Sequence, residues 1–116
     1  METINVSQNV IYWEIKRGVS QHTSIYKSDG WGMFDEIVMD FKLKKDINYP
    51  AELRLTVGNG ITIDGNDLIV SLTYEQTADF RVRNMYADIK LKIGTEVIDP
   101  IPYVINIVDT VTKLDS

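Results

Sequence analysis

The sequence contains no cysteine, only three prolines and a single histidine among its 116 residues. Without cysteine there is no disulfide framework, no thiolate nucleophile and no cysteine-ligated metal site. The single imidazole, that of His22, leaves no second one for the common zinc geometries. The chain therefore has to be held by an apolar core, and its length suits one domain over residues 1–116.

Basic residues are also in short supply. The 12 lysines and arginines face 17 acidic residues, which gives a formal net charge of −5. Affinity for nucleic acid comes mostly from cations that neutralise phosphates, so we expect no nucleic-acid partner. The small cluster of Lys42, Lys44 and Lys45 is interpreted as a solvated strand end. No apolar run approaches the roughly 20 residues that span a bilayer, and no secretory signal opens the chain, so we expect no membrane partner.

What the sequence does contain is a period-two alternation of apolar and polar residues, which is typical of strands with one buried face. The alternating runs lie near residues 11–16, 37–44, 53–57, 61–63, 68–72 and 87–93, and a last apolar run begins at Ile101. Turn sequences rich in Gly, Asn and Asp separate these runs, such as Asp64-Gly65-Asn66 between two of them. About seven antiparallel strands at this spacing indicate an all-β sandwich or barrel, and we favour a two-sheet sandwich.

One segment breaks the alternation. Thr73-Tyr74-Glu75-Gln76 has the form of a capping box, in which the Thr73 hydroxyl and the Gln76 side chain satisfy each other's backbone N–H groups. We expect one short helical turn near residues 74–79 that crosses between the two sheets. Residues 1–9 are interpreted as an extended N-terminal arm.

No combination of residues points to catalysis, to a cofactor or to a metal. His22 stands in a polar stretch and is interpreted as a surface-loop residue. Asp35 and Glu36 are adjacent, and adjacent strand residues point to opposite faces, so they do not converge on one substrate atom. Asp64, Asn66 and Asp67 lack the spacing of a calcium loop and are interpreted as a turn. We therefore expect a protein that is not an enzyme.

Two segments are candidates for a protein interface. Trp31 lies between two glycines, and the sequence leaves open whether it fills the core or anchors a partner. The last run is apolar on both faces, with Ile101 and Tyr103 on one face and Val104 and Val108 on the other; Val111 would extend the first face. Such a strand is either central in the sheet, which we favour, or covered by another chain.

The order of motifs resembles that of a known family. The motifs are Arg17-Gly18, the strand at 37–43, Gly58-Asn59-Gly60-Ile61-Thr62-Ile63, the strand at 68–73, Glu75-Gln76-Thr77-Ala78, the strand at 86–91 and Ile105-Asn106-Ile107. Together they resemble small immunoglobulin-like bacteriophage virion proteins, including the N-terminal domain of upper baseplate proteins and related head and tail accessory proteins. The resemblance covers most of residues 17–112 and implies an immunoglobulin-like sandwich.

The resemblance also implies a function. It leads us to expect a non-enzymatic structural or adaptor protein of a phage particle, at the capsid, neck or baseplate, made in the cytoplasm of a bacterial host. Its partners would be other virion proteins, and it would be a homo-oligomer or present in many copies. The alternative from a different class is a free-standing β-sandwich module that binds carbohydrate or protein through exposed aromatic residues such as Trp31.

Overall fold

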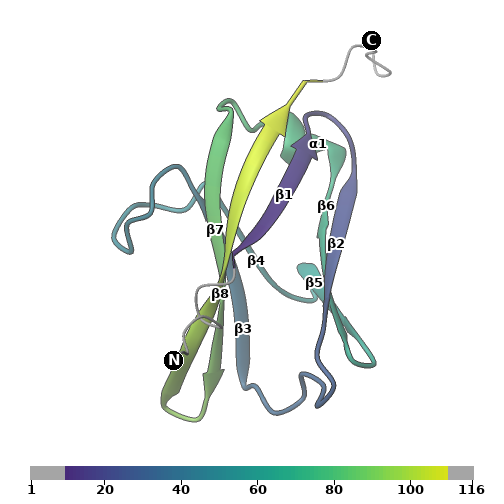
Figure 1. Ribbon diagram of the computed structural model, residues 1–116, viewed down its shortest axis with the longest axis vertical. Helices are drawn as coiled ribbons and strands as arrows, with labels where there is room; N and C mark the ends of the chain where they lie inside the picture. The colour runs from purple at the N-terminus through teal and green to yellow at the C-terminus, as the bar shows by residue number, and fades with distance from the viewer. Residues whose placement is uncertain (1–9, 110–116) are drawn as a thin grey trace.

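The computed structural model describes residues 10–109, apart from the side chain of Asp99. The expected N-terminal arm at residues 1–9 and the contribution of Val111 lie outside this range. The elements are β1 (Ile11–Lys16), β2 (Gln21–Tyr26), β3 (Glu36–Lys42), β4 (Leu53–Val57), β5 (Gly60–Asp64), β6 (Asp67–Leu72), α1 (Tyr74–Ala78), β7 (Asn84–Ile93) and β8 (Glu96–Val108). The described chain is thus all-β with one short helix, as the sequence predicts (Figure 1).

The eight strands form one hydrogen-bonded sheet in the order β1-β8-β7-β3-β4-β5-β6-β2. Five neighbouring pairs are antiparallel, but β1 runs parallel to β8 and β4 runs parallel to β5. The expectation of purely antiparallel pairing is therefore wrong for these two pairs. Alternation of apolar and polar residues reports which face is buried and carries no information about the direction of the neighbouring strand.

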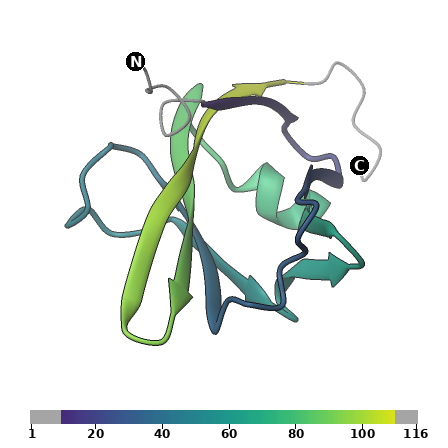
Figure 2. The ribbon, with the colours of Figure 1, turned by 60° about the horizontal axis from the view of Figure 1, so that its bottom comes forward.

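The sheet bends sharply where β4 passes into β5. These two strands share only two residue pairs, Thr56 with Gly60 and Val57 with Ile61. Gly60 has a φ of 97°, and a Cβ built on it would lie 2.5 Å from Cδ2 of Leu55, so only glycine fits there. The bend turns β5, β6 and β2 back across the core, and the whole sheet curls into an open barrel (Figure 2).

The interior of this curled sheet is filled by the inward side of each alternating strand. Fully buried side chains with at most 1% exposure include Ile15, Met39, Phe41, Leu55, Ile61, Leu68, Val70, Met85, Ile89, Tyr103 and Ile105. Phe80, from the segment after α1, stacks on Phe41 with the ring centroids 5.9 Å apart. The predicted inward face of most strands is therefore the buried one, because a strand presents every second side chain to the same side. Val57, at the end of β4, is an exception and is 54% exposed.

The strand that sequence reasoning missed is β2. Its burial alternates between half-buried and exposed residues, and Ile25 is the only aliphatic side chain on it. It pairs with β6 alone and forms an edge of the sheet. An edge strand made mostly of polar residues gives no apolar signal. His22 is exposed as expected, but it lies on this strand and not in a loop.

The predicted capping box is confirmed. The Gln76 backbone N–H donates to the Thr73 hydroxyl oxygen at 3.1 Å, and the Thr73 N–H donates to the Gln76 side-chain oxygen at 2.9 Å. The helix has only five residues and depends on such caps, because a short helix is marginal by itself.

A buried hydroxyl joins this helix to the turn between β1 and β2. Thr77 is fully buried, and its Oγ1 accepts from the backbone N–H groups of Gly18 at 2.9 Å and Val19 at 3.1 Å. Arg17 donates from Nε to the Phe80 carbonyl at 2.6 Å and also pairs with Asp109. The turn joins β1 and β2, which are the two edge strands of the sheet. By fixing this turn, the contacts hold the two edges close together and keep the sheet curled.

Replacing this hydroxyl tests the corner. In Thr77→Val the shape of the side chain is kept, but the Gly18 N–H loses its acceptor and the Val19 N–H keeps only the Lys16 carbonyl at 3.3 Å. We expect a loss of about 1–3 kcal/mol in the free energy of unfolding, measured by urea denaturation. Thr77→Ser keeps the oxygen and should lose less. Equal losses in the two variants would contradict the role assigned to the hydroxyl.

Candidate functional site

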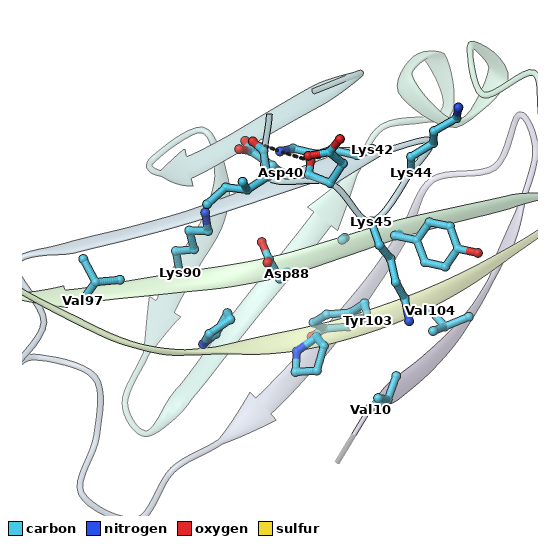
Figure 3. Close-up of a pocket in the computed structure, with 16 residues that line it drawn as sticks. Val10, Asp40, Lys42, Lys44, Lys45, Asp88, Lys90, Val97, Tyr103 and Val104 are labelled. Atoms are coloured by element: carbon cyan, nitrogen blue, oxygen red, sulfur yellow. Dashed lines mark hydrogen bonds between the residues drawn. The ribbon is translucent and has the colours of Figure 1, made fainter. Parts of the chain in front are cut away.

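A groove lies on the outer face of the sheet, over β3, β7 and β8 (Figure 3). We call it the outer groove, and its volume is about 540 Å³. Its floor consists of side chains that alternate with the buried ones and therefore point away from the core. These floor residues are Asp40 and Lys42 from β3, Tyr86, Asp88 and Lys90 from β7, and Pro102 and Val104 from β8.

One wall of the outer groove is the loop at residues 43–52 between β3 and β4, here called the lysine loop. Lys42 holds it in place, since its Nζ donates to the backbone carbonyls of Asp46 at 3.2 Å and Ile47 at 2.9 Å. Lys45 reaches from the loop toward the floor (Figure 3), and its Nζ lies 5.4 Å from the centre of the Tyr86 ring. This cation–π contact contributes about 0.5–1 kcal/mol at an exposed site.

Two aspartates face each other across the floor. Asp40 and Asp88 are direct neighbours on β3 and β7. Arg54 donates to both carboxylate oxygens of Asp40, at 2.7 and 2.9 Å, and this hydrogen bonding lowers the pKa of Asp40. Burial raises the pKa of Asp88, with Lys90 opposing that change and the Asp40 charge adding to it. The floor therefore combines one fully paired carboxylate with one that is costly to ionise.

Exposed apolar side chains surround the groove. Ile47 on the lysine loop is 75% exposed and Val97 near the β7–β8 turn is 65% exposed, and both line it. Tyr12 on β1 is 78% exposed and stands beside Val104, its register partner on β8. A scattered apolar side chain needs no explanation, but several around one groove are typical of a binding surface.

Trp31 is not part of this surface. It is 3% exposed, its ring lies 6.0 Å from that of Phe34, and its Nε1 donates to the Asn66 carbonyl at 3.0 Å. Of the two interpretations that the sequence left open for Trp31, the core position is the one observed. The interpretation of Trp31 as an exposed binding anchor is wrong. An indole packs in a core when its N–H finds an acceptor, and the turn at Asn66 supplies one.

The last strand is central, as the favoured interpretation had it, because β8 lies between β1 and β7. Tyr103 is 1% exposed, and Ile101 is half-buried and packs against the core, so both side chains lie on the inward side of the strand. Val104 and Val108 are half-buried and lie on the opposite side of the strand. Of these four residues, Val104 and the edge of Tyr103 border the outer groove.

The groove offers several kinds of side chain that can bind a partner. Ammonium groups, carboxylates, a phenol and apolar side chains can pair with charged and apolar groups of a partner. Among residues 10–109 no three His, Asp or Glu side chains gather as they would around a metal ion. The turn at Asn66 has a structural role, since the Asn66 carbonyl accepts hydrogen bonds from the Lys27 N–H and the Trp31 Nε1–H. No helix in this range is long and apolar enough to cross a membrane.

Sequence reasoning missed Lys45, Tyr86, Asp88 and Lys90 as residues of one site. The alternation in β7 does indicate that the last three share the outer face. What it lacks is any sign that the lysine loop rises beside that face to make a groove, because this depends on contacts between segments distant along the chain.

The hydroxyl of Tyr103 is buried without a hydrogen-bond partner in the described part of the chain. Burial raises its pKa to about 12, so it is neutral at ordinary pH. We expect Tyr103→Phe to leave stability unchanged or to increase it, because removing an unpaired buried polar group removes its desolvation cost. Tyr103→Ala should lose about 3–5 kcal/mol. A clear loss in the Phe variant, measured by denaturant unfolding, would reveal a partner for the hydroxyl.

Asp88 gives a pH-dependent prediction. Its pKa in the fold lies above the ordinary 3.8, so the folded chain holds this proton more tightly than the unfolded chain does. Its contribution to stability is therefore present below 3.8 and is lost as the pH rises through the raised pKa. Asp88→Asn should gain stability relative to the wild type as the pH increases across this window, measured by denaturation at each pH. A constant difference would contradict the raised pKa.

Comparison with known proteins adds no identity to this geometry. No protein-family model matches the chain, and no curated protein matches it either.

Proposed function

We propose that this chain is a non-enzymatic structural or adaptor protein of a bacteriophage particle, a capsid, neck or baseplate accessory protein that works by docking to other virion proteins. The outer groove would be its docking surface. The setting rests on the resemblance of its motifs to small phage virion proteins, and the binding mode rests on the groove.

The observation that supports the docking function is a set of exposed apolar side chains in and beside a groove with a charged floor. Ile47, Val97 and Tyr12 are exposed apolar side chains of large size, and Val104 lies among them. Protein interfaces have a similar make-up, with apolar and aromatic anchors beside polar groups that fix orientation. A standard interface buries about 800 Å² on each partner, so this face would be the centre of a contact and not all of it.

A weak contact at this one face can still give strong attachment when many copies of the chain are present. On a symmetric shell or hub, each additional contact becomes an intramolecular event, and the total affinity exceeds that of any single site. A small domain with one docking face is suited to such an arrangement.

The finer fold class is also part of the proposal. The sheet bends at Gly58-Asn59-Gly60, where β4 and β5 share only two residue pairs. The bend divides it into a half with β1, β8, β7, β3 and β4 and a half with β5, β6 and β2. We take these halves as the two layers of an immunoglobulin-like sandwich whose edges remain joined.

The second candidate, a free-standing module that binds carbohydrate or protein, has less support. Its proposed anchor, Trp31, is buried. Of the two tyrosines that line the groove, Tyr103 is buried and Tyr86 already has the Lys45 ammonium over its face. Glycan binding that is lost in Tyr86→Ala would favour this candidate.

Cross-linking mass spectrometry on purified phage particles tests the main proposal. We expect the chain to be present and its groove lysines, Lys44, Lys45 and Lys90, to be linked to neighbouring proteins of the particle, other copies of this chain included. Absence of the chain from particles would overturn the assignment.

A variant separates docking from folding. Val104→Glu places a charge in the apolar part of the groove without touching the core, so we expect at least a tenfold loss of incorporation into particles with an unchanged circular dichroism spectrum. Ser71→Glu introduces the same charge at an exposed position of β6, outside the groove, and should incorporate normally. Equal incorporation of the two variants would contradict the groove as the docking surface.

A further inference from the structure

A second charged surface lies at two turns, the one that follows β2 and the one that joins β5 to β6. The turn after β2 carries Asp29, and the β5–β6 turn carries Asp64 and Asp67. The two turns are bonded together, since the Lys27 N–H donates to the Asn66 carbonyl at 2.9 Å and the Asn66 amide donates to the Ser28 carbonyl at 3.4 Å. We call this surface the acidic tip.

The acidic tip has an apolar side chain of its own. Tyr26, which is 67% exposed, is the register partner of Asp67 at the end of the strand pair. The Lys27 Nζ lies 3.7 Å from Oδ2 of Asp29 and offsets part of the negative charge of the tip. The tip therefore presents carboxylates beside an exposed aromatic ring.

The outer groove has the opposite character. Its lining includes four lysines against three aspartates, and Asp40 is already paired with Arg54. In a chain with a net charge of −5, this is a place where cations collect. Lys44 and Lys45 are exposed on the lysine loop, next to the exposed Ile47.

The two surfaces lie on opposite sides of the molecule. In Figures 1 and 2 the lysine loop projects on the left and the β5–β6 turn lies on the right. A single molecule cannot bring its own tip into its own groove. A second copy can, and the same contact can then repeat.

We propose that the occupant of the outer groove is the acidic tip of a second copy of this chain, so that copies associate head to tail. Asp29 and Asp64 would pair with Lys44 and Lys45, and Tyr26 would contact the apolar rim at Ile47. This inference rests on the proposed docking function of the groove and names its partner. A contact between two different surfaces generates a ring if the rotation closes and a filament if it does not.

Sedimentation equilibrium at low salt tests the contact. We expect the weight-average mass of the wild type to rise with concentration and to fall back toward the monomer in about 1 M NaCl, where screening acts within about 3 Å. Lys44→Glu/Lys45→Glu and, separately, Asp29→Lys/Asp64→Lys should each remain monomeric, with the unchanged circular dichroism spectrum of a folded chain. A wild type that stays monomeric at low salt overturns the proposal.

Two quadruple variants of equal net charge decide whether the pairing is specific. The first variant combines Lys44→Glu/Lys45→Glu with Asp29→Lys/Asp64→Lys. Its groove is then acidic and its tip basic, so the two surfaces are complementary again and we expect association to return. Combining Lys44→Glu/Lys45→Glu with Glu75→Lys/Asp79→Lys places the new cations in α1 and at its C-cap, away from the tip, and should stay monomeric. If both quadruple variants associate, or neither does, the tip is not the partner of the groove.

The failure of this inference is distinguishable from failure of the docking function. A monomeric wild type whose groove lysines still cross-link to other virion proteins would remove the second copy as occupant and leave the docking function standing. A chain that associates head to tail but is absent from particles would overturn the role in the particle and leave the contact between copies standing.

Discussion

The fold depends on how the chain fastens the corner between β1 and β2. These strands are the two edges of one sheet, yet a short turn joins them, so the sheet has to curl until its edges meet at that turn. The buried hydroxyl of Thr77 accepts from the backbone N–H groups of Gly18 and Val19 there, and the guanidinium of Arg17 donates to the Phe80 carbonyl. An unsatisfied polar group at this point would cost about 1–3 kcal/mol, a large part of a small domain's stability.

Closing the corner also determines what the outer face can be. With the curled interior filled by apolar side chains, every second residue of β3, β7 and β8 must point outward. β8 is flanked on both sides, so its outward side chains form a continuous surface with those of β7. The lysine loop then converts this surface into a groove, fastened by Lys42 to its own carbonyls. The groove is thus a consequence of sheet order together with one loop.

The electrostatics of the groove follow from the same geometry. Register places Asp40 directly opposite Asp88, and two carboxylates at that spacing repel unless cations intervene. Arg54 neutralises the first, while the second, with its raised pKa, relies on Lys90 and Lys42. Sequence alternation alone places these residues on the outward side, but their pairing required the register. Lys45 over the Tyr86 ring could not be foreseen, because the contact joins a loop to a strand about forty positions away.

The sequence by itself determined the class of the fold, the inward face of most strands, the turns and the capping box. Each of these depends on neighbours within a few positions, as Thr73 and Gln76 illustrate. Only the tertiary structure decided that polar β2 is an edge strand, that β1 joins β8 in parallel, and that Trp31 is buried against the turn at Asn66. These features are contacts between distant segments, and their energies depend on which surfaces remain after the core has formed. The outer groove belongs with them, for the same physical reason.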